Sequence, residues 1–332
     1  MTYSGWDIKL YSISSRQEWD DFISGSRNGT FLFLRGYMDY HADRFKDSSL
    51  MAYHGGKLHA VLPAHVAGET LYSHCGLTYG GIVSDEKMTA ALMMELFDAL
   101  VHFMHSSLHV AKWIYRPVPY IYARYPSEED LYALFRFGGR LVERRISTVV
   151  PSAMPYGFST LRRRKTRHAL RAGFTLRKES DFEAFWTILE SNLGERHHAH
   201  PVHSLAEIQL LHDRFPENIV LHTVYDREDC MVAGCVMYLS ACVAHVQYIG
   251  STAKGRDNGA VDLLFDHLIH KVYSGFKYFD MGTSVEDGGQ LLNKGLVFQK
   301  EGFGGRAVVY DTYELDVVPD ACFRTADSSN FM

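Results

Sequence analysis

One order of predicted strands and helices occurs twice along the 332-residue chain, and this repetition limits the folds that it can adopt. In the second half, apolar periodicities predict a strand, two helices, three strands, a helix, a strand, a helix and a final strand. The first half repeats a less regular version of the same order. The sequence therefore predicts an α/β (α+β) protein with two related domains, each a mixed sheet flanked by helices.

The predicted elements follow from the local apolar patterns. In the second half they lie at residues 174–178, 182–193, 204–215, 219–225, 231–239, 243–249, 261–272, 277–281, 291–298 and 306–317. In the first half they lie at residues 7–13, 16–23, 50–53, 57–65, 70–73, 87–105, 111–116, 128–137 and 140–150. The helix at 261–272 has the clearest pattern, because its apolar residues repeat at i, i+3 and i+4.

The junction between the two domains is predicted at residues 151–157, where two prolines and a glycine interrupt regular structure. This places the first domain at 1–150 and the second at 151–318. The remaining residues, 319–332, form a polar tail that we expect to be frayed.

Composition excludes several classes of protein. Hydrophobic residues make up 46% of the chain and charged residues 22%, which is typical of a globular protein. The net charge of −5 gives no general attraction to DNA or to anionic membranes. The sequence has no signal-like start, no 18-residue apolar stretch and no CxxC pair among its five cysteines. We therefore expect a cytoplasmic protein with no DNA partner and at most peripheral membrane contact.

A glycine-rich segment near the end carries a lysine between two apolar and glycine-containing stretches. Residues 279–306 read FDMGTSVEDGGQLLNKGLVFQKEGFGGR, and Lys300 lies where a helix gives way to the last strand. Neighbouring glycines allow close backbone approach. The lysine could hold a phosphate or stabilise an oxyanion. The alternative is a solvated lysine on the last helical turn, favoured there by the helix dipole.

The segment STAKGRDNG, residues 251–259, precedes the long amphipathic helix. Backbone N–H groups at a helix N-terminus, together with Gly255, Arg256 and Gly259, could form a pyrophosphate cradle. The alternative is a plain connection between a strand and a helix.

The run LRRRKTRHALR, residues 161–171, is the densest charge in the chain. On a helix, Arg163, Arg167 and Arg171 fall at i, i+4 and i+8 on one stripe. Like charges at this spacing repel each other, and a phosphate-bearing partner would relieve the repulsion. The alternative is a solvated linker helix paired with acidic residues elsewhere.

The repeated order, together with LTYGGIVSD (77–85), STLRRRKTRHALRAG (159–173) and FQKEGFGG (298–305), resembles the acetyltransferase fold of the GNAT superfamily. Two copies in one chain resemble the FemABX-like transferases, which add amino acids to peptidoglycan precursors, and the related tandem acyltransferases. The resemblance spans nearly the whole chain, and the order of the motifs is its stronger part.

The resemblance implies roles for individual residues. Tyr79 and Gly80 would line an acceptor cleft, and Lys300 would sit at the reaction centre. Arg256, Gly259 and Ala260 resemble the coenzyme A loop of GNAT enzymes, but Val261 stands where that loop ends in a small residue. FemABX-like relatives use aminoacyl-tRNA and lack the tight loop, so the donor is either acyl-CoA or aminoacyl-tRNA.

Polar and aromatic residues on predicted strands complete the candidate site. His245 and Asp280 flank the proposed cleft, and one of them could act as general base, although buried strand residues are an alternative for both. Tyr248 could line an acceptor pocket. The run RHHAHPVHS (196–204) lacks the spacing of a zinc site, so we expect no metal and give His203 a pocket-lining or structural role.

The sequence thus predicts a transferase that moves an acyl or aminoacyl group onto an amine of a cell-envelope precursor or a similar small molecule. Lys300 would support the developing charge, and Asp280 or a water molecule would assist deprotonation. The rival is a non-catalytic pair of GNAT folds that docks anionic lipid or RNA through the basic helix at 162–171.

Overall fold

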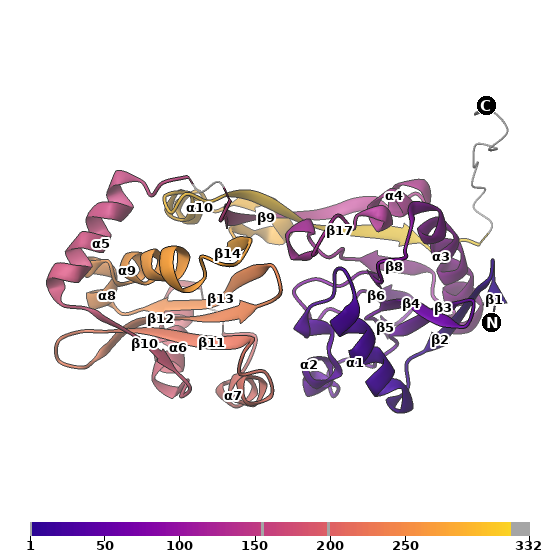
Figure 1. Cartoon of the computed structure of the whole chain (residues 1–332), viewed down its shortest axis with the longest axis horizontal. Helices are drawn as coiled ribbons and strands as arrows, with labels where there is room; N and C mark the ends of the chain where they lie inside the picture. The colour runs from indigo at the N-terminus through magenta and orange to yellow at the C-terminus, as the bar shows by residue number, and fades with distance from the viewer. Residues whose placement is uncertain (1, 154–155, 198–199, 320–332) are drawn as a thin grey trace. The chain divides into compact units, whose positions relative to one another are not determined.

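The computed structural model describes residues 2–153, 156–197 and 200–319, and the chain divides into two compact units (Figure 1). Unit 1 comprises Met1–Arg144 and Tyr310–Met332, and unit 2 comprises Arg145–Val309. This division differs from the expected ranges 1–150 and 151–318, because both division points fall inside long strands and the chain returns to unit 1 after residue 309. Of the expected tail at 319–332, only Pro319 lies among the described residues.

Unit 1 is a mixed α/β unit. Its strands are β1 (Thr2–Tyr3), β2 (Trp6–Leu10), β3 (Leu50–His54), β4 (Lys57–Leu62), β5 (His65–Ala67), β6 (Thr70–Tyr72), β7 (Val83–Ser84) and β8 (Lys112–Tyr115), with parts of β9 (Arg140–Pro151) and β17 (Arg306–Asp316). Its helices are α1 (Arg16–Gly25), α2 (Arg35–Met38), α3 (Ala90–Phe103) and α4 (Glu129–Arg136). One sheet has the order β1-β2-β3-β4-β7, and β8 pairs with β6 and with β17.

Helix α3 carries most of the helical contribution to the core of unit 1. Thr89 caps its N-terminus by accepting a hydrogen bond from the N–H of Leu92, and a π-helical turn, Met104–Leu108, continues it. Its apolar face packs Leu96, Phe97 and Leu100 into a core that also contains Trp113. The predicted helix at 87–105 is confirmed.

Unit 2 contains the remaining elements. Its strands are β10 (Thr175–Glu179), β11 (Ile219–Tyr225), β12 (Met231–Leu239), β13 (Val243–Ser251), β14 (Tyr278–Thr283), β15 (Val285–Glu286) and β16 (Leu291–Leu292), with the other parts of β9 and β17. Its helices are α5 (Thr160–Ala172), α6 (Glu183–His197), α7 (Leu205–Arg214), α8 (Ala253–Asn258), α9 (Ala260–His267) and α10 (Lys294–Glu301).

The sheet of unit 2 is covered on both faces. The order of its strands is β10-β11-β12-β13-β14-β9, antiparallel except for the parallel pair β13 and β14. Figure 1 shows α9 on one face and α6 on the other. The alternation along β12 explains this layering: Cys235 and Met237 join the core beneath α9, whereas a Cβ at Gly234 would meet Phe185 of α6.

Two predicted helix starts in unit 2 are present in the structure, and one further helix was not predicted. Ser159 caps α5, and Ser204 with Glu207 forms the capping box of α7. The segment expected as a loop at 251–259 instead forms α8, whose N-terminus is capped by the Thr252 hydroxyl. Among the residues that the structure describes, none of the helices is both long and apolar enough to cross a membrane.

Candidate active site

Strands β13 and β14 part in the middle of the sheet of unit 2. They pair from Val243 with Tyr278 to His245 with Asp280, and the described ladder ends there. Beyond this point β13 continues along β12, and β14 continues along β9. Both strands shift register here, β13 between Val246 and Tyr248 and β14 between Asp280 and Thr283. Such bulges re-aim side chains and are common beside active sites.

Asp280 is the acidic centre of the place where the strands part. Its side chain is fully buried, so its charge must be compensated by hydrogen bonds and cations. Oδ1 accepts hydrogen bonds from the Ser147 hydroxyl and from the N–H of Gly282 (2.9 Å). Oδ2 lies 2.8 Å from Nδ1 of His245. The carboxylate is therefore held by groups from three strands.

The contact with Asp280 fixes the tautomer of His245. An ionised carboxylate only accepts hydrogen bonds, so Nδ1 carries a proton, and in the neutral imidazole the lone pair is on Nε2. Nε2 has no partner among the described residues, and the side chain remains 12% exposed. A histidine held in this way can accept a proton from a bound molecule.

Gly282 links Asp280 to Lys300. Its φ of +76° lies in the left-handed region, which a side chain at this bulge would strain. Its N–H donates to Asp280, and its carbonyl oxygen accepts from Nζ of Lys300 at 2.8 Å. The N–H and the carbonyl group of Gly282 thus connect Asp280 to Lys300.

Lys300 lies in the last turn of α10 and points back to β14. Nζ donates to the carbonyl oxygens of Gly282 and Thr283 (2.8 and 2.9 Å). An ammonium has three donors, so one N–H remains for a bound molecule. Burial lowers the pKa of Lys300 to about 8, and the opposing charge of Asp280 only partly offsets this effect.

These groups together offer a proton acceptor and a cationic donor within one small region. His245 supplies the acceptor, Asp280 orients it, and Lys300 supplies the donor. Such a combination suits acyl transfer to an amine, which needs removal of a proton and stabilisation of an oxyanion. The positions predicted for Asp280 and Lys300 are consistent with this chemistry, and their roles stay predictions.

Two predicted substrate-binding residues meet further along β13. The Nδ1 of His203 lies 2.6 Å from the hydroxyl of Tyr248, which also accepts the N–H of His203 at 3.2 Å. The side chain of His203 is buried, and the Tyr248 ring contacts Trp186 of α6. Tyr248 follows His245 by three positions in β13. His198 and Ala199 of the histidine-rich run lie outside the described residues.

Tyr79 and Gly80 occupy packed positions in unit 1. The Tyr79 hydroxyl donates to Thr30 (3.2 Å), and its buried ring lies against Tyr122, with 4.4 Å between ring centroids. A Cβ at Gly80 would come within 2.7 Å of the carbonyl oxygen of Ser73. These contacts explain both residues by packing, and the acceptor cleft predicted for them stays a prediction.

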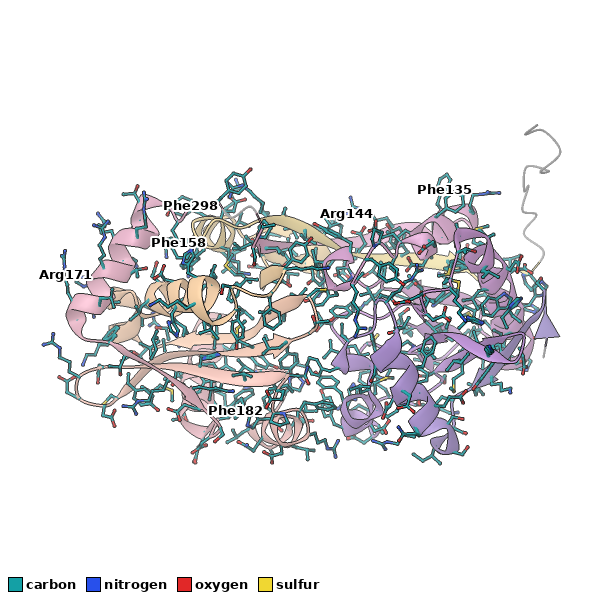
Figure 2. The ribbon with its side chains drawn as sticks, in the orientation of Figure 1. Phe135, Arg144, Phe158, Arg171, Phe182 and Phe298 are labelled. Atoms are coloured by element: carbon teal, nitrogen blue, oxygen red, sulfur yellow. The ribbon has the colours of Figure 1, made fainter. Side chains whose placement is uncertain are left out.

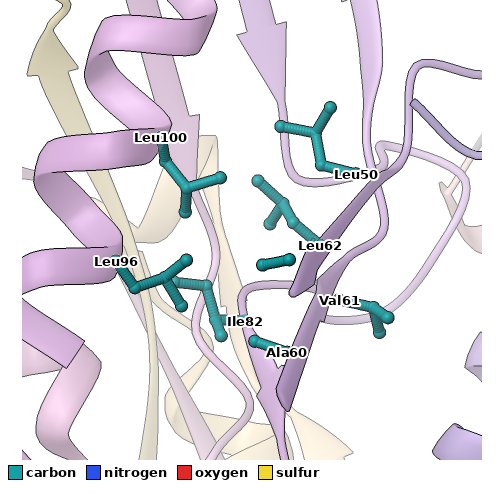
Figure 3. A pocket seen from close by; sticks show the side chains of 8 residues that line it. Leu50, Ala60, Val61, Leu62, Ile82, Leu96 and Leu100 are labelled. Carbon is teal, nitrogen blue, oxygen red and sulfur yellow. The ribbon is translucent and has the colours of Figure 1, made fainter. Parts of the chain in front are cut away.

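A small apolar pocket in unit 1 has no polar group to offer a substrate (Figure 3). It has an empty volume of about 160 Å³ and leaves no room for a water molecule. Its lining consists of Leu50, Ala52, Ala60, Val61, Leu62, Ile82, Leu96 and Leu100. We interpret it as a packing gap between α3 and the sheet.

The residues of the predicted pyrophosphate cradle lie in α8 and at the start of α9. The N–H of Gly255 donates to the Thr252 hydroxyl, and Arg256 donates to the carbonyl oxygen of Ser251. Gly259 and Ala260 are buried, and a Cβ at Gly259 would lie 2.7 Å from the carbonyl oxygen of Lys165. These contacts give the four residues a place in the packing of the two helices, and the binding of a diphosphate by them stays a prediction.

A buried ion pair lies in the first turn of α9. Asp262 accepts a hydrogen bond from Nη1 of Arg162 at 2.8 Å, and both side chains are buried. The carboxylate is favoured at this position by the positive end of the helix dipole. The pair joins α9 to α5.

The basic helix α5 presents a charged outer surface. Arg163, Arg164, Arg167 and Arg171 are exposed, and none of them forms an ion pair with a described residue. Arg171 extends from the C-terminal part of the helix away from the sheet (Figure 2). Arg162 behaves differently from its neighbours, because it faces Asp262 and the ring of Phe303.

Sequence reasoning gave His245 only as an alternative base and missed Ser147 altogether. Ser147 begins the buried part of β9, and nothing local in ISTVV indicates a partner more than a hundred residues away. The register of β9 with β14 brings it to Asp280. Among described residues, no group of three or more His, Cys, Asp or Glu side chains is arranged to hold a metal ion.

Comparison with known proteins defines the class of fold. Residues 159–288 match the family model of the acetyltransferase (GNAT) domain. The fold is similar to that of FemX, with a TM-score of 0.65 and 12% identity over 92% of this chain and 96% of that one. A tandem GNAT protein from the clavulanic acid biosynthesis pathway has a TM-score of 0.52 and 7% identity, covering 95% and 99% of the two chains.

A third similar structure is the C-terminal domain of an Agrobacterium fabrum protein named as a lysylphosphatidylglycerol synthetase. It gives a TM-score of 0.58 and 13% identity over 91% of this chain and 92% of that one. No curated protein sequence matches the chain. The chain thus carries a GNAT domain in unit 2 and has the fold of tandem GNAT proteins. The predicted resemblance to the FemABX-like, tandem GNAT-fold proteins is confirmed.

Proposed function

We propose that the protein is an N-acyltransferase or aminoacyltransferase that moves an acyl group onto an amine of a cell-envelope precursor or a similar small molecule. The observation that carries this proposal is the convergence of His245, Asp280 and Lys300 where β13 and β14 part. The GNAT match over residues 159–288 supports the reaction class.

In the proposed mechanism, transfer is direct and forms no covalent enzyme intermediate. The donor carbonyl lies between the parted strands, where backbone N–H groups and the third N–H of Lys300 stabilise the oxyanion. Nε2 of His245 takes the proton of the attacking amine, while Asp280 keeps the imidazole in place. Asp280, predicted as the base, is assigned here to orientation, because its side chain is fully buried.

For the donor, an aminoacyl ester such as aminoacyl-tRNA is proposed ahead of acyl-CoA. Gly255 and Gly259 are buried in the packing of α8 and α9, and Val261 stands where the coenzyme A loop of GNAT enzymes ends in a small residue. The similarity to FemX and to the lysylphosphatidylglycerol synthetase domain is consistent with this choice. Coenzyme A remains the alternative donor, since it is the donor that GNAT domains use.

The test is a transfer assay with matched donors. The purified protein is incubated with labelled aminoacyl-tRNA or labelled acetyl-CoA, and a UDP-linked muramyl pentapeptide serves as the amine acceptor. We expect label in the acceptor from aminoacyl-tRNA, and loss of transfer in His245→Gln. Transfer from acetyl-CoA alone would reverse the choice of donor. No transfer from either donor to this or other amine acceptors would overturn the proposal.

A second candidate function rests on the arginines of α5 that form no ion pair with the part of the chain that the structure describes. A non-catalytic protein could dock an anionic partner through Arg163, Arg167 and Arg171, which are exposed on one stripe. Charge reversal at Arg163 and Arg167 would then abolish function, whereas Lys300→Ala would leave it intact. Loss of function in the cell on Lys300→Ala alone would exclude this candidate.

A further inference from the structure

Ser147 contacts the site from β9 although no sequence motif marks it. Its side chain is fully buried, and its hydroxyl donates to Oδ1 of Asp280. A buried hydroxyl is costly without a partner. In the buried part of β9, Ser147 and Thr148 are polar and Val149 and Val150 are apolar, and an alanine at 147 would bury no hydroxyl. Ser147 therefore needs a reason beyond packing.

Oδ1 of Asp280 already accepts the N–H of Gly282 at 2.9 Å, and Oδ2 faces His245. The hydroxyl of Ser147 is a second donor to the same oxygen. Hydrogen bonds to a carboxylate stabilise its negative charge and reduce its attraction for a neighbouring cation. The cation that Asp280 attracts during transfer is protonated His245.

We propose that Ser147 is a positioning residue that sets, through Asp280, how readily His245 takes up a proton. The inference rests on the proposed function of His245 as the base. With Ser147 present, the charge of Asp280 is directed partly toward Ser147 and Gly282, so removal of the Ser147 donor would direct more of this charge toward the imidazole of His245.

The proton balance of the step shows why release matters. The amine nitrogen forms a bond to the acyl carbon, and its proton passes to Nε2 of His245. The bond from the acyl carbon to the donor oxygen then breaks, and that oxygen leaves with the electron pair. It takes the proton from the imidazolium, so the base returns to its starting state. Asp280 stays ionised throughout and continues to accept the hydrogen bond from the Nδ1–H of His245.

The experiment is an NMR titration of the His245 imidazole in the full chain, which needs no substrate. The His245 signal is assigned among the 18 histidines by its absence in His245→Gln. In Ser147→Ala we expect its titration midpoint to rise by about half a pH unit or more, a threefold or greater gain in proton affinity. Ser147→Thr keeps the hydroxyl and should return the midpoint toward the wild-type value.

Ser284→Ala is the matched control. Ser284 is also a fully buried serine next to this site, but its hydroxyl has no hydrogen-bond partner among the described residues. Its removal should leave the His245 midpoint unchanged. If Ser147→Ala does not fold, Ser147→Cys replaces the hydroxyl by a weaker donor of similar size, and a smaller rise in the same direction is expected.

The two proposals fail in different ways. An unchanged midpoint in folded Ser147→Ala would overturn the role of Ser147, whatever the transfer assay gives. A raised midpoint supports that role even if the donor or acceptor has been misassigned. In an active wild-type enzyme, the acidic limb of the transfer rate should move to higher pH in Ser147→Ala by the same amount. An active variant whose acidic limb does not move would count against the role.

Discussion

Lys300 of α10 donates a hydrogen bond from Nζ to the carbonyl oxygen of Gly282 in β14, at 2.8 Å, although β15 and β16 lie between these two elements in the chain. The N–H of the same glycine binds Asp280. The ammonium and the carboxylate are therefore placed by one residue whose left-handed backbone favours glycine. Any change that moves the bulge in β14 will displace the two charged groups together.

The first prediction concerns the ammonium. Lys300→Met keeps most of the length of the side chain but removes its charge and its donors. If the third N–H stabilises the oxyanion, kcat for acyl transfer should fall about 10²- to 10³-fold with a smaller change in KM. Lys294→Ala, at the exposed first residue of α10, should leave kcat unchanged. Equal rates for Lys300→Met and wild type would remove Lys300 from the mechanism.

The second prediction follows from the lowered pKa of the same lysine. Because burial brings the pKa of Lys300 to about 8, its charge is present below that pH and lost above it. The transfer rate should therefore decline as the pH rises through about 8. Lys300→Arg keeps a positive charge at all these pH values, so any remaining activity should lose this decline. A wild-type rate that stays level to pH 10 would contradict the assignment.

Much of the fold could be predicted because its signals are local. The caps at Ser159 and Ser204 mark helix starts within a few residues, and the stripe at 261–272 marks α9. Helix α8 was missed because its glycines and polar residues are typical of loops, whereas the Thr252 cap and packing against β12 stabilise the helix. Tertiary contacts therefore determine the helical conformation of this segment.

The candidate site could be predicted only in part, because its contacts are long-range. Lys300 was found through a local lysine–glycine pattern that resembles a known family. The pairing of Asp280 with His245 depends on the register of two parallel strands separated by a helix. Ser147 depends on a third strand, and its role cannot be seen without the sheet order. Arg256 and Gly259 match a motif that is local in the sequence, whereas the buried pair Arg162–Asp262 joins residues a hundred positions apart and has no local signal.

The third prediction concerns a buried histidine in unit 1. His74 lies beside His41 and His65, at ring-centroid distances of 5.0 and 5.5 Å, and burial lowers its pKa to about 3. In the unfolded chain the pKa of a histidine is near 6.5. Below that pH the unfolded chain therefore binds more protons than the folded chain, and the free energy of unfolding decreases as the pH is lowered. Between pH 7.5 and 5.0 we expect a loss of about 2 kcal/mol from this group.

His74→Asn tests this prediction by urea denaturation at the two pH values. Asparagine tolerates the positive φ of +32° at this position and does not titrate. The variant should lose less stability on acidification than wild type does. His105→Asn, at an exposed site, should behave like wild type. Equal losses for wild type and His74→Asn would show that other groups dominate the acid response.

The last prediction concerns the ion pair between α5 and α9. Arg162 and Asp262 are 2.8 Å apart, with side chains only 9% and 5% exposed. Asp262→Ala leaves a buried guanidinium without its counter-charge, which should destabilise unit 2 by about 3–5 kcal/mol. Hydrogen exchange in α5 and α9 measures the effect locally.

Two controls separate burial from charge. Asp316→Ala breaks a pair with Arg140 whose side chains are 52% and 55% exposed, so solvent screens it and its loss should cost far less than that of Asp262→Ala. The double replacement Arg162→Met and Asp262→Leu removes both charges, so it should restore most of the exchange protection. If the double variant exchanges as fast as Asp262→Ala, the helices depend on the ion pair itself and not on avoiding an unpaired charge.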